Sequence, residues 1–198
     1  MLPSTVIGNS STKPKRILLF SGKRKSGKDY ITEILHKRQL GLQKSTIIRL
    51  SGPIKTHWAK SLNLDLDQLL GNGAYKEEYR IKMCEWGENM RAKDNGYFCR
   101  AAIDMYDVRD KSVWIVSDVR RKTDIQWFIE NYGDICKTIR IVCSEEVRQK
   151  RGWVYTLGID DAETECDLDD VNTWDVLLEN NNDNDIEIIM QQLLLLVD

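Results

Sequence analysis

The stretch ILLFSGKRKSGKD, residues 17–29, decides the fold of this chain. Its first four residues, Ile17–Phe20, form a short apolar run that predicts a buried strand, and from Lys28 onward the apolar residues keep helical spacing. Between strand and helix, Gly22 and Gly27 precede Lys28 in the spacing of the phosphate-binding pattern G-x-x-x-x-G-K. The sequence therefore predicts a strand, a phosphate-binding loop and a helix in succession.

A loop of this kind binds phosphate largely through its backbone. Glycines allow successive N–H groups to point at phosphate oxygens, and the start of the following helix adds partial positive charge. We expect Lys28 to reach the β- and γ-phosphates of a nucleotide. Asp29 stands where the pattern usually has a hydroxyl ligand for Mg²⁺, and a carboxylate can supply that oxygen directly or through water. The expected ATP-binding residues in this loop are Gly22, Lys23, Arg24, Lys25, Ser26, Gly27, Lys28 and Asp29.

The loop carries more positive charge than nucleotide binding requires, because Lys23, Arg24 and Lys25 add to Lys28. Two unit charges 4 Å apart interact by about 1 kcal/mol in water and about 4 kcal/mol at an effective dielectric constant of 20. Nearby negative charge would relieve this repulsion. We hypothesise that the loop faces more phosphate than one nucleotide brings; the alternative is that these side chains simply point to solvent.

Composition narrows the class of protein. The chain has 198 residues, of which 41% are hydrophobic, and this suits one domain over residues 16–198 after a flexible leader at residues 1–15. A net charge of −2 gives no basic field for nucleic acid. The five cysteines lack paired spacing and there are only two histidines, which indicates reduced thiols and no zinc site. No apolar run is long enough to span a bilayer, and the ending LLLLVD is not a peroxisomal signal. We expect a cytosolic monomer without membrane partners.

Four further apolar runs predict strands, and helical patterns separate them. Their ranges are Thr46–Leu50, Val113–Val116, Thr138–Val142 and Trp174–Leu178. Strands that alternate with helices favour an α/β three-layer sandwich with a mostly parallel central sheet. In such sheets, ligands bind at the carboxyl ends of the strands.

Further cations follow these strands or line one helix. On a helix over residues 75–91, Tyr75, Tyr79, Met83, Trp86 and Met90 share one arc and Lys76, Arg80 and Arg91 share the adjacent arc. Arg120 and Arg121 follow the strand Val113–Val116, where Asp118 is suited to hold Mg²⁺ through water. Arginines around a phosphate loop indicate that a second phosphate is held, as in a transferase whose acceptor is itself a phosphate.

Residues 144–170 have the composition of a mobile lid. Arg148 and Arg151 begin the segment, Gly152 and Gly158 could serve as pivots, and seven acidic residues follow within eleven positions. These acids are Asp160, Asp161, Glu163, Glu165, Asp167, Asp169 and Asp170. Closure of such a lid would exclude the water that competes for the γ-phosphate.

Several segments, in this order, closely resemble the animal-type phosphomevalonate kinases. They are LLFSGKRKSGKD, LSGPIK, YKEEYR, WGENMR, FCR, VSDVRR with DIQWF, RQKRGWVYT, GIDDAETECDLD and ENN. The resemblance covers roughly residues 17–180 and implies a P-loop fold like that of the nucleoside monophosphate kinases. It also implies MgATP-dependent phosphorylation of (R)-5-phosphomevalonate to 5-diphosphomevalonate in the mevalonate route to isoprenoids.

The resemblance further implies roles for single residues. Lys25, Lys28, Arg120 and Arg148 are expected to be catalytic, and Arg151 is expected to face the nucleotide. Lys76, Arg80, Arg91, Arg120, Arg121 and Asn180 are expected to contact phosphomevalonate. Asp29 and Asp118 are expected to hold Mg²⁺, and Arg140 falls on the lid side. Asn181 departs from the family pattern, because relatives have histidine there.

Two other functions fit part of the pattern. A nucleoside monophosphate kinase shares the sheet, the loop and the lid, but needs a pocket that selects a base. A nucleotide-binding interaction protein without turnover would explain Asp29 at the end of the loop, although Lys28, Asp118 and the arginine clusters argue against it.

Overall fold

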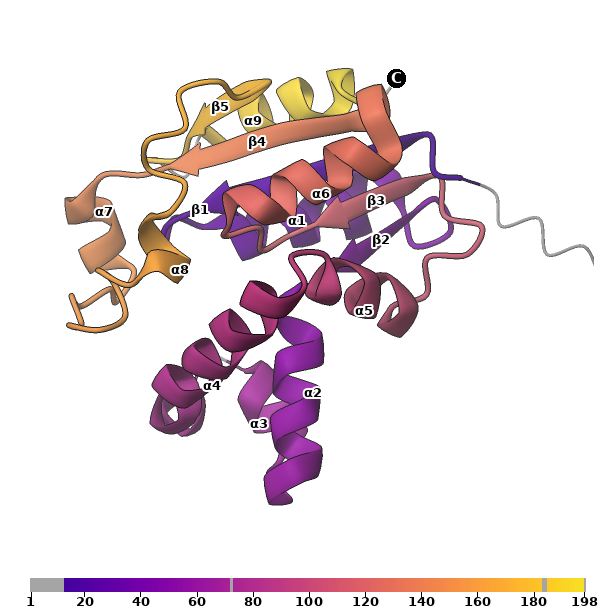
Figure 1. Ribbon diagram of the computed structural model, residues 1–198. Helices are drawn as coiled ribbons and strands as arrows, with labels where there is room; N and C mark the ends of the chain where they lie inside the picture. The colour runs from indigo at the N-terminus through magenta and orange to yellow at the C-terminus, as the bar shows by residue number, and fades with distance from the viewer. Residues whose placement is uncertain (1–12, 72, 183–184, 198) are drawn as a thin grey trace, which may run out of the picture.

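A computed structural model describes residues 13–71, 73–182 and 185–197. The phosphate-binding loop lies at the carboxyl end of the central strand of a parallel sheet. Within these residues five strands pair in the order β2-β3-β1-β4-β5, and every pair is parallel (Figure 1). The strands are β1 (Arg16–Gly22), β2 (Ser45–Ile48), β3 (Val113–Val116), β4 (Cys136–Val142) and β5 (Val176–Glu179). The α/β fold with a parallel central sheet is confirmed.

β1 and β4 extend beyond their predicted ranges, whereas β2 and β5 each fall short at one end, where a side chain replaces backbone pairing. The second strand was expected to reach Leu50, but β2 ends at Ile48 and the helix α2 (Ser51–Leu62) begins almost at once. Asp118 causes this turn, because its carboxylate accepts the backbone N–H groups of Leu50 at 2.6 Å and of Ser51 at 3.1 Å. Residues 51–53 form the first turn of α2, where a proline is tolerated.

The fifth strand begins two residues later than predicted, at Val176. The side chain of Asp175 accepts hydrogen bonds from both the backbone N–H and the hydroxyl of Thr138, at 2.8 and 2.7 Å. At this position β4 is therefore hydrogen-bonded to a side chain, and not to the backbone of a fifth strand.

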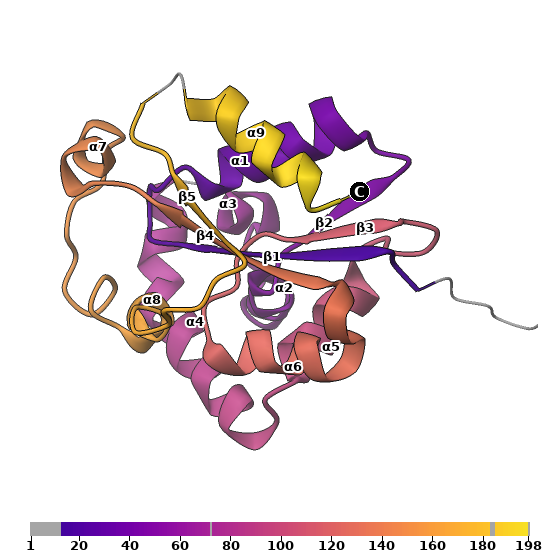
Figure 2. The ribbon, with the colours of Figure 1, turned by 90° about the horizontal axis from the view of Figure 1, so that it is seen from above.

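Helices cover both faces of the sheet (Figure 2). One face carries α1 (Lys28–Ile34), its π-helical continuation η1 (Leu35–Leu40) and α9 (Asp185–Leu195). The other carries α5 (Tyr97–Met105) and α6 (Lys122–Tyr132), which is followed by η2 (Gly133–Ile135). Each face has its own core: Ile31 and Ile189 pack on the first, and Ala102 and Phe128 on the second. These helices and the sheet form the predicted three layers.

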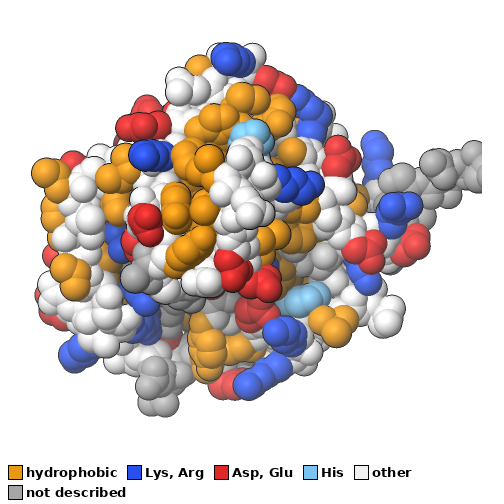
Figure 3. All heavy atoms as spheres, turned by 90° about the horizontal axis from the view of Figure 1, so that it is seen from below, with side chains coloured by type: hydrophobic (Ala, Val, Ile, Leu, Met, Phe, Trp, Pro, Cys, Tyr) orange, Lys and Arg blue, Asp and Glu red, His pale blue; other side chains and the backbone are white. Residues whose placement is uncertain are grey.

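A third apolar cluster lies outside the three layers. It joins α2 to α3 (Leu66–Leu70) and α4 (Ala74–Lys93), and these helices project away from the sheet in Figure 1. The predicted stripe on α4 is confirmed, because Tyr75, Tyr79, Met83, Trp86 and Met90 all belong to this cluster. Figure 3 shows the molecule from below, the side on which these helices project in Figure 1, and hydrophobic side chains are exposed there between charged ones. Leu62, Leu70 and Ile81 are among the large hydrophobic residues left exposed.

The segment after β4 contains two short helices, α7 (Glu145–Lys150) and α8 (Glu163–Cys166), near the carboxyl ends of the strands (Figure 1). Most of the leader expected at residues 1–15 lies outside the described residues; within them, Lys15 donates its backbone N–H to Ser112 at 2.8 Å. In the described part of the chain, no helix combines the length and apolar character needed to cross a membrane.

Candidate active site

The phosphate-binding loop is folded tightly between β1 and α1. Lys25 and Gly27 have positive φ angles of 62° and 91°. A Cβ on Gly27 would stand 2.2 Å from Nδ2 of Asn180, and one on Gly22 would stand 2.8 Å from the backbone oxygen of Ile141. Both glycines of the pattern are therefore required sterically, Gly22 by the neighbouring strand and Gly27 by its backbone angle and Asn180.

Two long-range donors hold the loop from outside. Asn180, at the end of β5, and Arg151, after α7, both donate to the backbone oxygen of Ser26, at 2.8 and 3.2 Å. Arg148 donates to the backbone oxygen of Arg24 at 2.8 Å, and its guanidinium lies 4.0 Å from the ring centre of Trp153. The last strand and the segment after β4 thus fix the shape of the loop.

The acidic run meets the extra cations of the loop. Asp160 pairs with the Arg24 guanidinium at 2.8 Å, and Glu165 accepts the backbone N–H of Arg24 at 2.5 Å. Lys23 forms an ion pair with Asp169. The side chains of Asp160 and Glu165 are only 4% and 3% exposed, so the contacts of these two acids with Arg24 are shielded from solvent.

This arrangement corrects the hypothesis that a second phosphate explains all three extra cations. For Lys23 and Arg24, the compensating negative charge comes from the chain's own residues 160–169. Lys25 is exposed and stays available to a ligand.

Two adjoining cavities open beside the loop. The first, which we call the loop cavity, has a volume of about 360 Å³ and is lined by Gly22–Tyr30, Lys76, Glu77, Arg80, Arg120 and Arg151. The second, the α4 cavity, has a volume of about 180 Å³ and lies between α1, α2 and α4. Five residues line both, so the cavities meet there: Lys28, Asp29, Lys76, Arg80 and Arg120.

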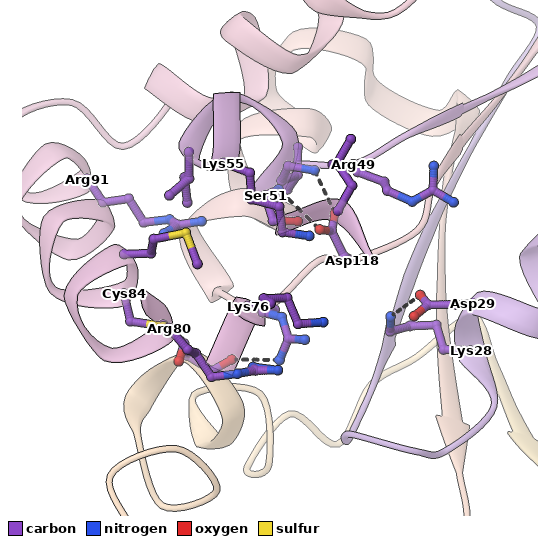
Figure 4. Close-up of a pocket in the computed structure, with 16 residues that line it drawn as sticks. Lys28, Asp29, Arg49, Ser51, Lys55, Lys76, Arg80, Cys84, Arg91 and Asp118 are labelled. Atoms are coloured by element: carbon purple, nitrogen blue, oxygen red, sulfur yellow. Dashed lines mark hydrogen bonds and ion pairs between the residues drawn. The ribbon is translucent and has the colours of Figure 1, made fainter. Parts of the chain in front are cut away.

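The α4 cavity is strongly basic. Its lining includes seven basic residues, Lys28, Arg49, Lys55, Lys76, Arg80, Arg91 and Arg120, against two acidic ones, Asp29 and Asp118. Figure 4 shows the cations of α2 and α4 on one side of this space, with Lys28 and Asp29 opposite them. The predicted basic ridge of α4 thus faces a cavity and not open solvent. Such a surface suits a small ligand with several negative charges.

Crowding of these cations changes their proton affinity. Burial, together with the nearby charges of Lys55 and Arg80, lowers the pKa of Lys76 to about 8. Burial is also the main cause that lowers the pKa of Lys55, which Asp118 only partly opposes. The cations of the site therefore repel one another, and an anionic ligand would reduce this repulsion.

Arg120 stands where the two cavities meet. It forms an ion pair with Glu165 and lies close to the backbone oxygen of Thr164, so the segment after β4 also orients this arginine. Arg120 is thus the described arginine that contacts α8 and lines both cavities.

The two acids expected to hold Mg²⁺ differ in their surroundings. The carboxylate of Asp29 has Lys28 Nζ at 3.0 Å, although the side chain is 69% exposed. Partial desolvation within the site raises the pKa of Asp29, but Lys28, Arg120 and Arg49 together outweigh this and lower it, which favours the ionised form. Asp118 lines the α4 cavity, but both its oxygens accept backbone N–H groups of α2. Asp29 therefore fits a metal ligand, with phosphate oxygens and water completing the shell, whereas Asp118 is engaged as a helix cap. Among the described residues there is no group of three or more potential metal-ligating side chains.

Three residues expected at the substrate or the reaction centre line neither cavity. Arg121 lies among Glu88, Glu163 and Asp167, at 3.2, 3.0 and 3.6 Å. Asn180 and Arg148 contact the loop from behind, as described above. Asn181 accepts the backbone N–H of Ser144 at 2.8 Å and so holds the start of α7.

Two basic residues of the α4 cavity were missed by the sequence analysis, Arg49 and Lys55. Both follow β2 within a few residues, at the same edge of the sheet as Asp118 and Arg120. The rule that ligands bind at the carboxyl ends of strands could have found them, had it been applied to the second strand as well as the third.

Comparisons with known proteins agree with this geometry. The family model described as "Phosphomevalonate kinase" matches residues 20–134. A Drosophila melanogaster protein named "Phosphomevalonate kinase" is 52% identical over 177 residues, covering 88% of this chain and 93% of that protein. The crystal structure of TT1252 from Thermus thermophilus is similar in fold, with a TM-score of 0.57 and 14% identity, over 92% of this chain and 98% of the other. The family match and the Drosophila relative each cover more than half of the chain, and the chain therefore belongs to the phosphomevalonate kinase family.

Proposed function

We propose that this chain transfers the γ-phosphoryl group of MgATP to the phosphate of (R)-5-phosphomevalonate, giving 5-diphosphomevalonate and ADP. The observation that carries this proposal is the pair of adjoining cation-lined cavities, one at the phosphate-binding loop and one between α2 and α4. The name of the 52% identical relative supports the identity of the acceptor.

The reaction needs positioning and charge neutralisation more than it needs a base. An acceptor phosphate is already anionic and can attack without losing a proton to the protein, which fits a site without histidine among its lining residues. The main obstacle is the repulsion between two polyanions brought into line. Lys28 and Arg120, which line both cavities, are placed to contact the transferred group, while Lys55, Lys76 and Arg91 hold the acceptor.

Mg²⁺ would be held by Asp29 together with phosphate oxygens of the nucleotide and water. When bound, it would neutralise charge on the β- and γ-phosphates. Asp118 would take part only through water, because its oxygens are occupied by the N-terminus of α2.

We further propose that residues 144–170 act as a lid within a single kinase domain. Its acids contact the loop through Arg24 and contact Arg120 through Glu165, so closure would bring the loop and Arg120 into their described positions together. Gly152 and Gly158, with φ angles of 79° and 77°, provide two positions where the backbone can pivot.

A coupled assay of ADP formation tests the proposed function. Purified protein with MgATP should release ADP when phosphomevalonate is added, and not when AMP, GMP, CMP or UMP is added at the same concentration. ADP release that depends on a nucleoside monophosphate would make this chain a nucleotide kinase. If none of the acceptors on the panel supports ADP release, the chain would be a nucleotide-binding protein without this transfer activity.

A further inference from the structure

Asp124, in the first turn of α6, lies behind the wall of the α4 cavity. Its side chain is buried, and it is not among the residues that line either cavity. One oxygen, Oδ1, lies 3.5 Å from Nε of Arg91. The other, Oδ2, accepts the backbone N–H of Arg121 at 3.2 Å and lies 3.4 Å from that of Arg120. A single carboxylate thus connects Arg91, a cavity arginine on α4, to the backbone that carries Arg120, which lines both cavities.

Arg91 is held on three sides. Its Nη1 donates to Glu88 at 3.3 Å, its guanidinium lies 4.8 Å from the ring centre of Phe98, and Asp124 faces its Nε. Neither Arg91 Nε nor Asp124 Oδ1 has a hydrogen-bond partner among the described residues, so each depends on the other for its electrostatic environment.

Burial raises the pKa of Asp124, and Arg91 and the backbone N–H groups of Arg120 and Arg121 oppose this rise only in part. A fully buried acid destabilises the fold unless positively charged groups or hydrogen-bond donors surround it. The pairing is therefore specific to these groups and does not arise from a solvated surface.

We propose that Asp124 is a positioning residue for the phosphate acceptor: it fixes the guanidinium of Arg91 and the backbone at Arg120 in the geometry that binds phosphomevalonate. This inference rests on the proposed function, because it assigns the acceptor to the α4 cavity.

The sign of the effect separates positioning from simple electrostatics. Replacing Asp124 with Asn removes whatever negative charge this buried acid carries close to an anion-binding cavity, so Coulomb's law alone predicts acceptor binding that is tighter or unchanged. Positioning predicts the opposite, because Arg91 loses the partner that fixes its Nε. Asn keeps the volume of the side chain and an oxygen that can still accept the N–H groups of Arg120 and Arg121, so α6 keeps its cap.

The test is steady-state kinetics of D124N with phosphomevalonate and MgATP, read as separate KM values. We expect the KM for phosphomevalonate to rise by about tenfold to a hundredfold, the loss that corresponds to one charge-assisted interaction, while the KM for ATP stays within about twofold. E130Q, on the exposed side of the same helix, is the matched control and should leave both values unchanged. An unchanged or lowered KM for phosphomevalonate in D124N would overturn the proposal.

A double-mutant comparison identifies the route of the effect. In an Arg91→Ala background, Asp124→Asn should add little further increase in the KM for phosphomevalonate, because the group it positions is gone. Asp124 would be only a structural cap if the substitution raised the KM for phosphomevalonate equally in both backgrounds. In that case the KM for ATP should rise in parallel and the thermal stability should fall. If D124N does not fold, Arg91→Lys tests the same contact from the other side, because lysine keeps the charge but lacks Nε. A normal KM for phosphomevalonate in that variant would also overturn the proposal. Wild-type protein that does not use phosphomevalonate would refute the proposed function separately.

Discussion

Binding of phosphomevalonate to the nucleotide-free protein should weaken as the pH rises from 7 to 9, because Lys76 loses its proton in this range. Lys76 lines both cavities, and burial together with Lys55 and Arg80 brings its pKa down to about 8 from the ordinary 10.5. The side chain is then about nine-tenths protonated at pH 7 and about one-tenth protonated at pH 9. If the ammonium is required for binding, the dissociation constant rises about tenfold across these two pH units.

Isothermal titration calorimetry at several pH values measures this dependence directly. The acceptor phosphate has its second pKa near 6, so the ligand itself hardly changes charge between pH 7 and 9. Unfolding does not mimic the effect, because the unfolded state, with Lys76 at its ordinary 10.5, binds more protons than the folded state between pH 8 and 10.5. Lys76 therefore makes the folded state relatively more stable as the pH rises through that window, and its penalty is fully present only below pH 8.

Lys76→Arg is the decisive variant, since arginine keeps its charge throughout this pH range. The variant should lose most of the pH dependence, and the remainder should come from Lys55, whose pKa is also lowered. A flat profile in the wild-type protein would refute the depressed pKa of Lys76. A full tenfold dependence retained in Lys76→Arg would show that another group titrates.

Three further changes test other parts of the site. Lys28→Met should lower turnover by about a hundredfold or more, the loss typical of a removed transition-state donor, while circular dichroism stays unchanged; near-normal turnover would remove Lys28 from the phosphate-binding role. Asp29→Asn should raise the Mg²⁺ concentration needed for half-maximal activity, and an identical magnesium titration would mean that Asp29 holds no metal. Asp160→Ala should lower the free energy of unfolding by about 3 kcal/mol, because it removes a buried carboxylate that pairs with the partly buried Arg24 guanidinium and accepts N–H groups of Trp153 and Thr156. Asp170→Ala, which removes a solvent-exposed pair with Lys122, is the control and should change the free energy of unfolding much less; equal losses in both variants on chemical denaturation would contradict the shielded pair.

Local features of the chain could be read directly from the sequence. The loop between Gly22 and Lys28 was predicted because its pattern, its strand and its helix are contiguous. The stripe and the basic ridge of α4 were predicted because helical periodicity is a local property. The order of strands and helices likewise led to the parallel sheet.

Long-range pairing could not be predicted in the same way. Lys23 and Arg24 pair with acids about 140 positions later, and nothing in their spacing identifies those partners. Arg121 looks equivalent to Arg120 in sequence, yet adjacent residues point in different directions, and the structure turns Arg121 toward Glu88 and Glu163. Asp118 was expected to hold Mg²⁺ through water because it follows a strand, but its contacts with the backbone N–H groups of Leu50 and Ser51 are visible only in the fold.

The central claim is that two mutually repelling phosphate compounds occupy the loop cavity and the α4 cavity at the same time. A crystal structure with a non-hydrolysable ATP analogue, Mg²⁺ and phosphomevalonate tests it most directly. The terminal phosphate of the analogue should contact Lys28, the acceptor should contact Lys76 and Arg91, and Arg120 should lie between the two ligands. Side chains of Lys76, Arg91 and Arg120 turned into bulk water, with the acceptor bound elsewhere, would contradict the account.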